Sequence, residues 1–381
     1  MRLTIIGAGM QGTAAGYDMA RFAGADEIRM LDVDSERAEA AADRINRLVE
    51  GDLARPGTID ARDPVGVRDA LAGSKATLSA APYHLNLGLA EAAVDVGSSF
   101  GDLGGNTEIV RAELELHDLA AAAGVTVLPD LGLAPGLGNS LAVYAMDRVD
   151  SPRSVRIRCG GLPQDPRPPL GYKLVFSVEG LTNEYFGKAV VLRDGRREEI
   201  DTFSELETVD FPKPIGRLEA FTTSGGTSTC PWSLAGRIAD FDYKTLRYPG
   251  HFERMKTLRD MGFLDLEPVE VEGMEVVPRS VFHTLARRAL DFPGDRDLVV
   301  LRVVCEGDGG SCEIDIIDHH DEETDFSAME RMTAFPASIG VIAMAHGRLA
   351  PGAVPLELAL DSTHVVDELP RRGIEVRVRR S

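Results

Sequence analysis

The sequence predicts an α/β protein with a doubly wound parallel sheet, followed by a second, mostly antiparallel α+β domain for substrate binding or dimerisation. A glycine-rich turn follows the first apolar run, and strand and helix patterns alternate over the first 128 residues. Beyond Asp150 the pattern becomes rich in strands, and helical patterns return after residue 328. Together these observations indicate a Rossmann-type domain and a second domain. We predict the first domain over 1–128 plus about 330–381, and the second over 129–329.

The turn Gly7-x-Gly9-x-x-Gly12 lies between an apolar run, Leu3 to Ile6, and a helical pattern, Thr13 to Phe22. Gly7 allows a tight turn, Gly9 lets the backbone approach a pyrophosphate, and Gly12 lets the helix pack on the strand. The start of the helix offers free N–H groups to phosphates. The residues expected to bind the cofactor here are Gly7, Gly9, Met10, Gln11 and Gly12.

An acidic residue ends the second predicted strand, which runs from Glu27 to Leu31. Asp32 follows it, twenty residues after Gly12. A carboxylate at this place accepts hydrogen bonds from ribose hydroxyls and repels a 2′-phosphate. The sequence therefore predicts NAD as the cofactor, in preference to NADP.

The remaining strands of the first domain are predicted at 58–61, 76–80, 98–101 and 125–128, separated by helices. Ser35 and Thr107 are expected to cap two of these helices. Ligands of such sheets bind beyond the carboxyl ends of the strands. Further cofactor contacts are therefore expected from Ala81, Pro82 and Gly104. Asp102 and Asp130 are the strand-end acids expected nearest the nicotinamide, although each could instead cap a following turn.

The second domain is predicted to be built from strands at 155–159, 172–177, 189–193, 218–223, 243–247, 298–305 and 312–317. Asp194-Gly195 and Asp308-Gly309 are typical of two-residue hairpin turns. The second turn would place Cys305 opposite Cys312. We nevertheless expect free thiols.

Composition excludes several classes of partner. The net charge of −20 argues against binding to nucleic acid or to an anionic membrane. Met1-Arg2 leads directly into a strand and no apolar run is long enough to cross a bilayer, so we expect a cytoplasmic protein. The cysteines lack zinc spacing, and the run Asp318-His-His-Asp321 is expected to be a solvated loop. No bound metal is expected.

Longer strings in the second domain resemble a known family. These strings are Gly160-Gly-Leu-Pro-Gln-Asp-Pro, Phe176-Ser-x-Glu-Gly-Leu181, Glu219-Ala-Phe-Thr-Thr-Ser-Gly-Gly-Thr-Ser228 and Lys244-Thr-Leu-Arg-Tyr-Pro-Gly-His251. They are similar to the lysine 6-dehydrogenase branch of the saccharopine dehydrogenase-like family. The resemblance implies NAD-dependent oxidation of the ε-amine of L-lysine to allysine and ammonia. We expect a homo-oligomer, in the first place a homodimer.

In that context the candidate catalytic residues are Asp130, then Asp102, with Lys173 as a possible base or carboxylate contact. Arg247 offers a fork for the substrate carboxylate, or instead forms a surface salt bridge. The candidate substrate-binding residues are Tyr172, Thr223, Ser224, Arg247 and His251. Tyr172 is also a candidate core residue, and His251 a packed imidazole. Two other functions remain open: an imine-reducing saccharopine or carboxynorspermidine dehydrogenase, and a non-catalytic NAD-binding sensor.

Overall fold

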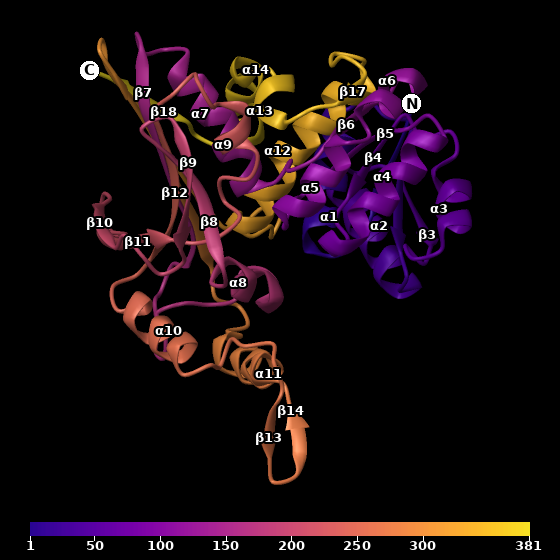
Figure 1. The fold of residues 1–381 in the computed structure, drawn as a ribbon. Coiled ribbons are helices and arrows are strands. Elements are labelled where there is room, and N and C mark those ends of the chain that lie inside the picture. The colour runs from indigo at the N-terminus through magenta and orange to yellow at the C-terminus, as the bar shows by residue number, and fades with distance from the viewer.

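Seven parallel strands form the first sheet in a computed structural model that describes all 381 residues (Figure 1). Their order is β17-β6-β5-β4-β1-β2-β3, which confirms the predicted Rossmann-type sheet. The strands are β1 (Arg2–Ile6), β2 (Glu27–Asp32), β3 (Ala54–Thr58), β4 (Ala76–Ser79), β5 (Ser99–Asp102), β6 (Thr126–Leu128) and β17 (Gly352–Ala353).

Helices cover both faces of this sheet, which explains why its inner strands are continuously apolar. Leu3 and Ile5 pack toward one face, and Ile6 and Leu31 pack toward the other. The first face is covered by α1 (Met10–Phe22), α2 (Ser35–Leu48) and α12 (Ala328–Ala345). The second is covered by α3 (Pro64–Leu71), α4 (Asn86–Asp95) and α6 (His117–Ala123), with α5 (Thr107–Leu114) beside α4.

Local details of the first domain differ from the sequence prediction in two ways. The caps of α2 and α5 are Asp34 and Asn106, each one residue before the predicted cap. β3 lies at 54–58 rather than at 58–61, although it contains Pro56 and Gly57. It is an edge strand that pairs only with β2, and an edge strand tolerates a proline.

The second sheet has the strand order β10-β11-β12-β7-β15-β16-β18, with the β8–β9 hairpin attached to β12. All pairs are antiparallel except β12 with β7. Both predicted hairpins are confirmed, and Cys305 pairs directly with Cys312. The strands are β7 (Pro152–Pro163), β8 (Lys188–Arg193), β9 (Arg196–Asp201), β10 (Glu207–Asp210), β11 (Arg217–Thr222), β12 (Asp240–Arg247), β15 (Asp297–Gly307), β16 (Gly310–His319) and β18 (Arg377–Arg380).

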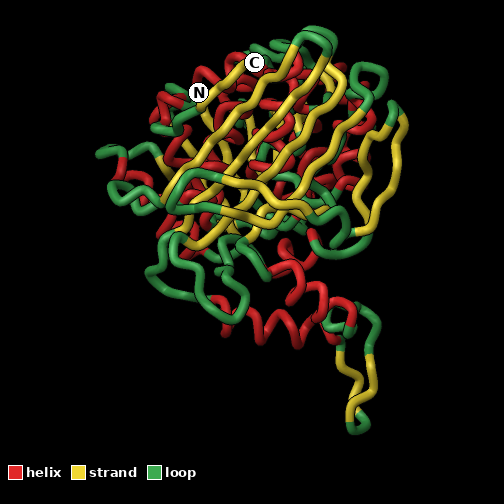
Figure 2. Tube along the Cα trace, turned by 90° about the vertical axis from the view of Figure 1, so that its left-hand side faces the viewer, coloured by secondary structure: helices red, strands yellow, loops and turns green.

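Helices α7 (Gly138–Met146) and α12 pack on the inner face of the second sheet, whereas Figure 2 shows no helix over the outer face. The other helices are α8 (Val178–Glu184), α9 (Cys230–Ser233), α10 (His251–Asp260), α11 (Pro278–Leu290), α13 (Leu356–Ala359) and α14 (Ser362–Glu368). A small hairpin of β13 (Val269–Val271) and β14 (Met274–Val276) projects from the body (Figure 1). No helix combines the length and the apolar character needed to cross a bilayer.

The predicted strand at 172–177 is wrong. Tyr172 and Val175 are buried, but the segment is an irregular connection between the sheet and α8. Its apolar residues are buried by side-chain packing, and Leu174 donates its N–H to the carbonyl of Leu290 rather than to a neighbouring strand. Apolar alternation alone does not distinguish such a segment from a strand.

The end of the chain contributes to both sheets. After the second sheet, α12 and β17 return to the first domain, where β17 pairs with β6. The last strand, β18, then pairs with β16 of the second sheet. The predicted boundaries at 128 and 330 remain predictions, but residues 377–380 extend the second sheet and not the first.

Candidate active site

The glycine-rich turn between β1 and α1 has the space and the donors that a pyrophosphate needs. Gly7 has a φ of +99°, and a Cβ there would lie 2.7 Å from the backbone of Ala80. A Cβ on Gly12 would lie 1.8 Å from the Gly7 carbonyl oxygen, whereas one on Gly9 would meet nothing within 4 Å. No side chain caps the start of α1, so its first N–H groups remain available. These residues fit a dinucleotide.

Asp32 is held in place at the end of β2. Its carboxylate accepts hydrogen bonds from the N–H of Ala8, at 2.8 Å, and of Asp34, at 3.0 Å. The guanidinium of Arg37 lies 3.8 Å from the same carboxylate, and its side chain is 56% exposed. The position predicted to bind the ribose therefore contains both an acid and an exposed cation.

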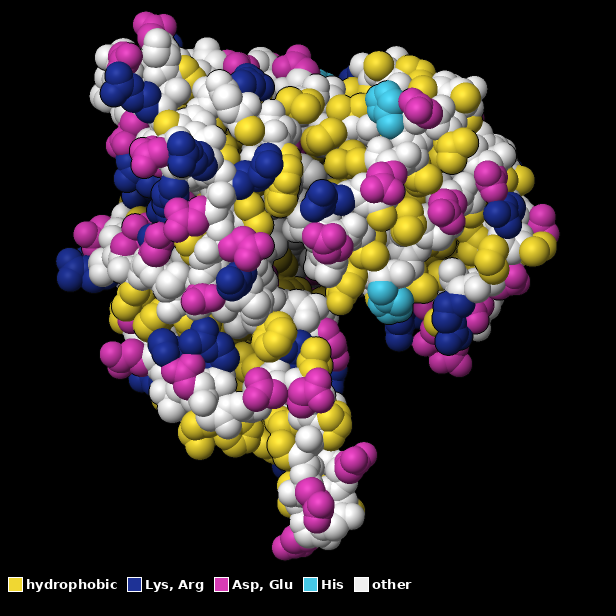
Figure 3. Space-filling model, in the orientation of Figure 1, with side chains coloured by type: hydrophobic (Ala, Val, Ile, Leu, Met, Phe, Trp, Pro, Cys, Tyr) yellow, Lys and Arg dark blue, Asp and Glu magenta, His cyan; other side chains and the backbone are white.

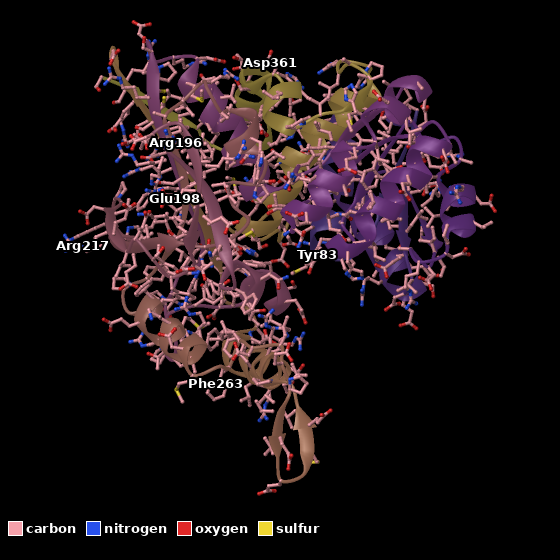
Figure 4. All side chains as sticks on the ribbon, viewed as in Figure 1. Tyr83, Arg196, Glu198, Arg217, Phe263 and Asp361 are labelled. Atoms are coloured by element: carbon pink, nitrogen blue, oxygen red, sulfur yellow. The ribbon has the colours of Figure 1, made fainter.

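The carboxyl ends of β4, β5 and β6 converge beside this turn. The N–H of Leu131 donates to the carbonyl of Asp102 at 2.7 Å. A Cβ on Gly104 would clash with the carboxylate of Asp130, and one on Gly105 would meet Tyr83. Figure 4 places Tyr83 on the side of the first domain that faces α8, and Figure 3 shows the surface hollowed between the two domains. The structure thus brings Asp102 and Asp130 together at the cleft.

Four buried carboxyl groups meet at this edge of the sheet, and we call them the acidic cluster: Asp102, Glu113, Asp130 and Glu357. Each residue is at most 4% exposed. Asp102 Oδ2, both oxygens of Glu113 and Glu357 Oε2 have no hydrogen-bond partner. No lysine or arginine forms an ion pair with any of the four. The cluster is therefore a buried group of carboxyl groups without a counter-cation.

Burial and mutual repulsion keep protons on this cluster. Burial raises the pKa of Asp102 to about 6. Burial, together with the charges of Asp102 and Asp130, raises the pKa of Glu113 to about 10. Burial and the neighbouring Asp102 also raise the pKa of Asp130 well above its ordinary value. A cation that enters the cluster would offset the repulsion between the carboxylates. It would thereby lower their pKa values and favour the ionised forms.

Ser228 contacts Asp130 from the second domain. Its hydroxyl donates to Asp130 Oδ2, and both residues have positive φ, +41° for Ser228 and +64° for Asp130. Such backbone conformations cost roughly 1–3 kcal/mol each and persist where the surroundings impose them. Thr229 Oγ1, next in the chain, donates to Glu357 Oε1 at 2.8 Å. The loop between β11 and α9 is thereby fixed to the acidic cluster.

A second buried cluster surrounds Arg247, at the end of β12, and we call it the arginine cluster: Tyr172, Glu184, Tyr185, Arg247 and His251. Arg247 Nε donates to the Tyr185 hydroxyl at 2.9 Å, and Nη2 lies 3.4 Å from Glu184 Oε2. The guanidinium carbon lies 4.9 Å from the centre of the Tyr172 ring. Arg247 therefore forms a buried ion pair and not a surface salt bridge.

The other predicted residues of this region have different surroundings. His251 begins α10 and shares a hydrogen bond of 2.8 Å with Tyr185, and burial, with Arg247 nearby, lowers its pKa to about 3. It is a packed, neutral imidazole. The Tyr172 hydroxyl is buried and has no partner, and neither has the Thr223 hydroxyl. Lys173 lies apart from the acidic cluster, where its amine donates to the Asp295 carbonyl at 2.6 Å.

One loop connects the two clusters. Ser224, after β11, bonds to α8 through its N–H, which donates to the Glu184 carbonyl at 2.8 Å, and through its hydroxyl, which donates to the Asn183 carbonyl at 2.7 Å. Four residues later, Ser228 donates to Asp130. The loop therefore links the acidic cluster, at the edge of the first sheet, to the arginine cluster of the second domain.

Sequence reasoning missed four residues of these clusters, Glu113, Glu184, Tyr185 and Glu357, and also Ser228, which contacts the acidic cluster. Three are glutamates on helices, where nothing local separates a buried acid from a solvated one. Ser228 belongs to a glycine-rich string after a strand, which was a usable signal. For metals, no group of three or more suitable side chains is arranged to hold an ion. Asp318 is not solvated, because it is buried and bonds to Arg331 Nε at 2.8 Å.

A parallel sheet with a glycine-rich turn, joined to a mixed sheet and with buried carboxyl groups at the carboxyl ends of its strands, defines a two-domain protein of the dinucleotide-binding class. Residues 3–128 match the saccharopine dehydrogenase NADP-binding domain, and residues 132–374 match the saccharopine dehydrogenase C-terminal domain. The chain belongs to the saccharopine dehydrogenase family.

Several characterised proteins are similar to this chain. The NADP⁺-dependent, L-glutamate-forming saccharopine dehydrogenase of Saccharomyces cerevisiae is 28% identical over 235 residues, which cover 58% of this chain and 51% of that protein. The Schizosaccharomyces pombe enzyme of the same name is 28% identical over 217 residues, 54% of this chain and 47% of that one. The chain thus aligns with about half the length of these relatives.

Two solved structures share the fold. The apo form of the S. cerevisiae enzyme has a TM-score of 0.77 at 20% identity and covers 100% of this chain and 99% of its own. A homospermidine synthase from Legionella pneumophila, in complex with NAD, has a TM-score of 0.70 at 12% identity, with coverage of 100% and 91%. At these identities the likeness concerns the fold alone.

Proposed function

We propose that this protein is an NAD-dependent dehydrogenase that oxidises the ε-amine of L-lysine to an imine, which water converts to allysine and ammonia. The observation that carries the proposal is the acidic cluster, which has no counter-cation and lies beside the turn that fits a dinucleotide. A protonated amine supplies the missing charge. Family membership supports chemistry at a carbon–nitrogen bond.

In this mechanism the arriving ammonium favours the ionised form of Asp130, which releases its proton to solvent. The Asp130 carboxylate then takes the proton from the substrate ammonium, so that the nitrogen lone pair can form the C=N bond. The Gly7–Gly12 turn and Asp32 would hold NAD, which would accept the hydride from the substrate carbon. Ser228 orients the Asp130 carboxylate through its hydrogen bond. Asp130 then releases this proton to solvent, and as a carboxylate it takes a proton from the water molecule that attacks the imine carbon. Ammonia leaves from the resulting carbinolamine as its hydroxyl loses a proton and becomes the aldehyde carbonyl. Asp102, bonded to the N–H of Gly104, is the second candidate for the base.

At the other end of the substrate, Arg247 is the proposed partner of the α-carboxylate. The guanidinium packs over the ring of Tyr172, whose unpaired hydroxyl is proposed as a further donor. For the cofactor, Asp32 supports NAD, whereas Arg37 at 3.8 Å is the feature that favours some use of NADP. We also propose a homodimer, which the uncovered outer face of the second sheet supports (Figure 2).

The alternative function is an imine-reducing dehydrogenase that joins two molecules through nitrogen. It is favoured by the names of the relatives, which act on saccharopine or form homospermidine. Saccharopine carries a second amino-acid arm, which needs a further cationic partner, and the acidic cluster contains none. A non-catalytic NAD-binding sensor would not need buried carboxylates without partners.

A substrate panel tests these functions. Formation of NADH is measured with lysine, ornithine, saccharopine and carboxynorspermidine. The proposal expects the highest kcat/KM with lysine. A higher kcat/KM with saccharopine or carboxynorspermidine would favour the imine-reducing dehydrogenase instead. If no compound is turned over, the result favours the non-catalytic NAD-binding sensor.

A further inference from the structure

We propose that Glu184 binds the α-ammonium of the substrate beside Arg247, which makes the site selective for zwitterionic α-amino acids. This inference rests on the proposed function and names the substrate class. It assigns the two charges of the arginine cluster to the two charges of an amino-acid head group.

Exposure distinguishes the two members of this ion pair. The side chain of Glu184 is 28% exposed, whereas that of Arg247 is 3% exposed. Glu184 Oε2 has one partner, Arg247 Nη2 at 3.4 Å, which is long for a charged hydrogen bond. The carboxylate therefore has acceptor positions that no donor of the protein occupies.

Internal bonds leave Arg247 one free edge. Its Nε donates to Tyr185 at 2.9 Å, and its Nη1 donates to Thr245 Oγ1 at 2.8 Å and to the Leu246 carbonyl at 2.9 Å. Only the Nη2 side, next to Glu184, lacks a close partner. A substrate carboxylate at Nη2 would place its neighbouring α-ammonium within reach of the Glu184 carboxylate.

Charge balance favours a zwitterion over a diamine. Arg247 and Glu184 together are neutral, so a head group with one positive and one negative charge leaves the pair balanced. A diamine would bring a second cation next to the buried guanidinium without a carboxylate to offset it, and uncompensated charge in a buried site is costly. An ω-amino acid would leave Glu184 without its partner.

The loop between the clusters limits their separation. The N–H of Ser228 donates to the Gly225 carbonyl at 3.0 Å, which closes a turn whose end Cα atoms lie within ~7 Å. Ser224 adds one Cα–Cα step of ~3.8 Å, so the Cα atoms of Ser224 and Ser228 lie within ~11 Å of each other. The loop therefore keeps the end of α8 and Asp130 in the same region of the molecule.

The experiment compares Glu184→Gln with the wild type, using Glu179→Gln as the matched control. Glu179 lies on the same helix, α8, but its partner is Arg287 on the surface. Kinetics are measured with lysine and with 6-aminohexanoate, which lacks the α-amine. Binding of norleucine, which has the head group but no ε-amine, is measured by calorimetry on the NAD-loaded protein.

Loss of a charged hydrogen bond predicts a ~10- to 100-fold higher KM for lysine in Glu184→Gln, with kcat within ~2-fold. Norleucine binding should weaken by the same factor, while the KM for 6-aminohexanoate and all values for Glu179→Gln should stay unchanged. An equal loss with lysine and 6-aminohexanoate, or unchanged norleucine binding, would overturn the inference. If the wild type does not oxidise lysine, the proposed function fails, whereas norleucine binding still decides the role of Glu184.

Discussion

Substitution of Asp130 by asparagine removes the proposed base and leaves its surroundings intact. Asparagine has nearly the same shape, tolerates the left-handed φ of +64°, and can still accept the hydrogen bond from Ser228. Because burial and Asp102 raise the pKa of Asp130 well above its ordinary value, the amide replaces a protonated, neutral carboxyl group, so the free energy of unfolding should not fall. Loss of a positioned base typically costs ~100- to 10,000-fold in rate, or about 3–5 kcal/mol in the activation barrier.

The expected result is a kcat with lysine at least ~100-fold lower, with the Kd for NAD within ~2-fold of the wild type. Activity of the variant should rise with pH, because more of the substrate then arrives as the free amine. Steady-state kinetics between pH 7 and 10 and NAD titration by fluorescence measure both quantities. If the variant keeps most of its activity at neutral pH, Asp130 is not the base and Asp102 becomes the leading candidate.

Three further predictions concern the cofactor, the buried acids and the thiols. Catalytic efficiency with NAD should exceed that with NADP by at least ~10-fold. Asp32→Ala should lower this ratio of efficiencies, and Arg37→Ala should raise it. Equal efficiency with both cofactors would contradict the proposal that NAD is the preferred cofactor. The pKa of Glu113 rises from 4.5 to about 10 on folding, so the folded protein holds a proton that the unfolded chain releases, and stability falls as pH rises through this window. Relative to the wild type, Glu113→Gln should therefore gain about 1.4 kcal/mol in the free energy of unfolding per pH unit between pH 6 and 8, and parallel urea-denaturation profiles would disprove this. Cys305 and Cys312 are paired in register but are free thiols, so the unreduced, unfolded protein should titrate as four thiols and not two.

The sequence predicted the first domain well because its signals are local. The run from Leu3 to Ile6, the glycines after it and Asp32 each show their role within a few residues. Elements whose stability comes from distant packing were predicted less well. The edge strand that contains Pro56 and Gly57 was not predicted at its true position, because these two residue types are rare in strands. Tyr172 to Ser177 was predicted as a strand because packing around Arg247 also buries apolar residues.

The candidate site was predictable only where strand ends define it. Asp102 and Asp130 follow predicted strands, and their proximity follows from the topology of a parallel sheet. Glu113 and Glu184 lie on helices among other acids, and only the tertiary structure separates them from Glu115 and Glu179. The hydrogen bond from Lys173 to the Asp295 carbonyl could not be predicted either, because the two residues are more than a hundred positions apart in the chain.

The order of elements along the chain has a consequence for biosynthesis. A ribosome delivers β1 to β6 first, but the helix that covers one face of their sheet, α12, begins only at Ala328. A nascent chain that ends near Leu128 therefore exposes the apolar residues of α1 that pack on α12. Domains usually fold as units during synthesis, beginning at the N-terminus. Here the first domain cannot complete its core until α12 has been synthesised, after most of the second domain. An incomplete chain therefore depends on protection from aggregation until only roughly the last tenth of the sequence remains to be synthesised.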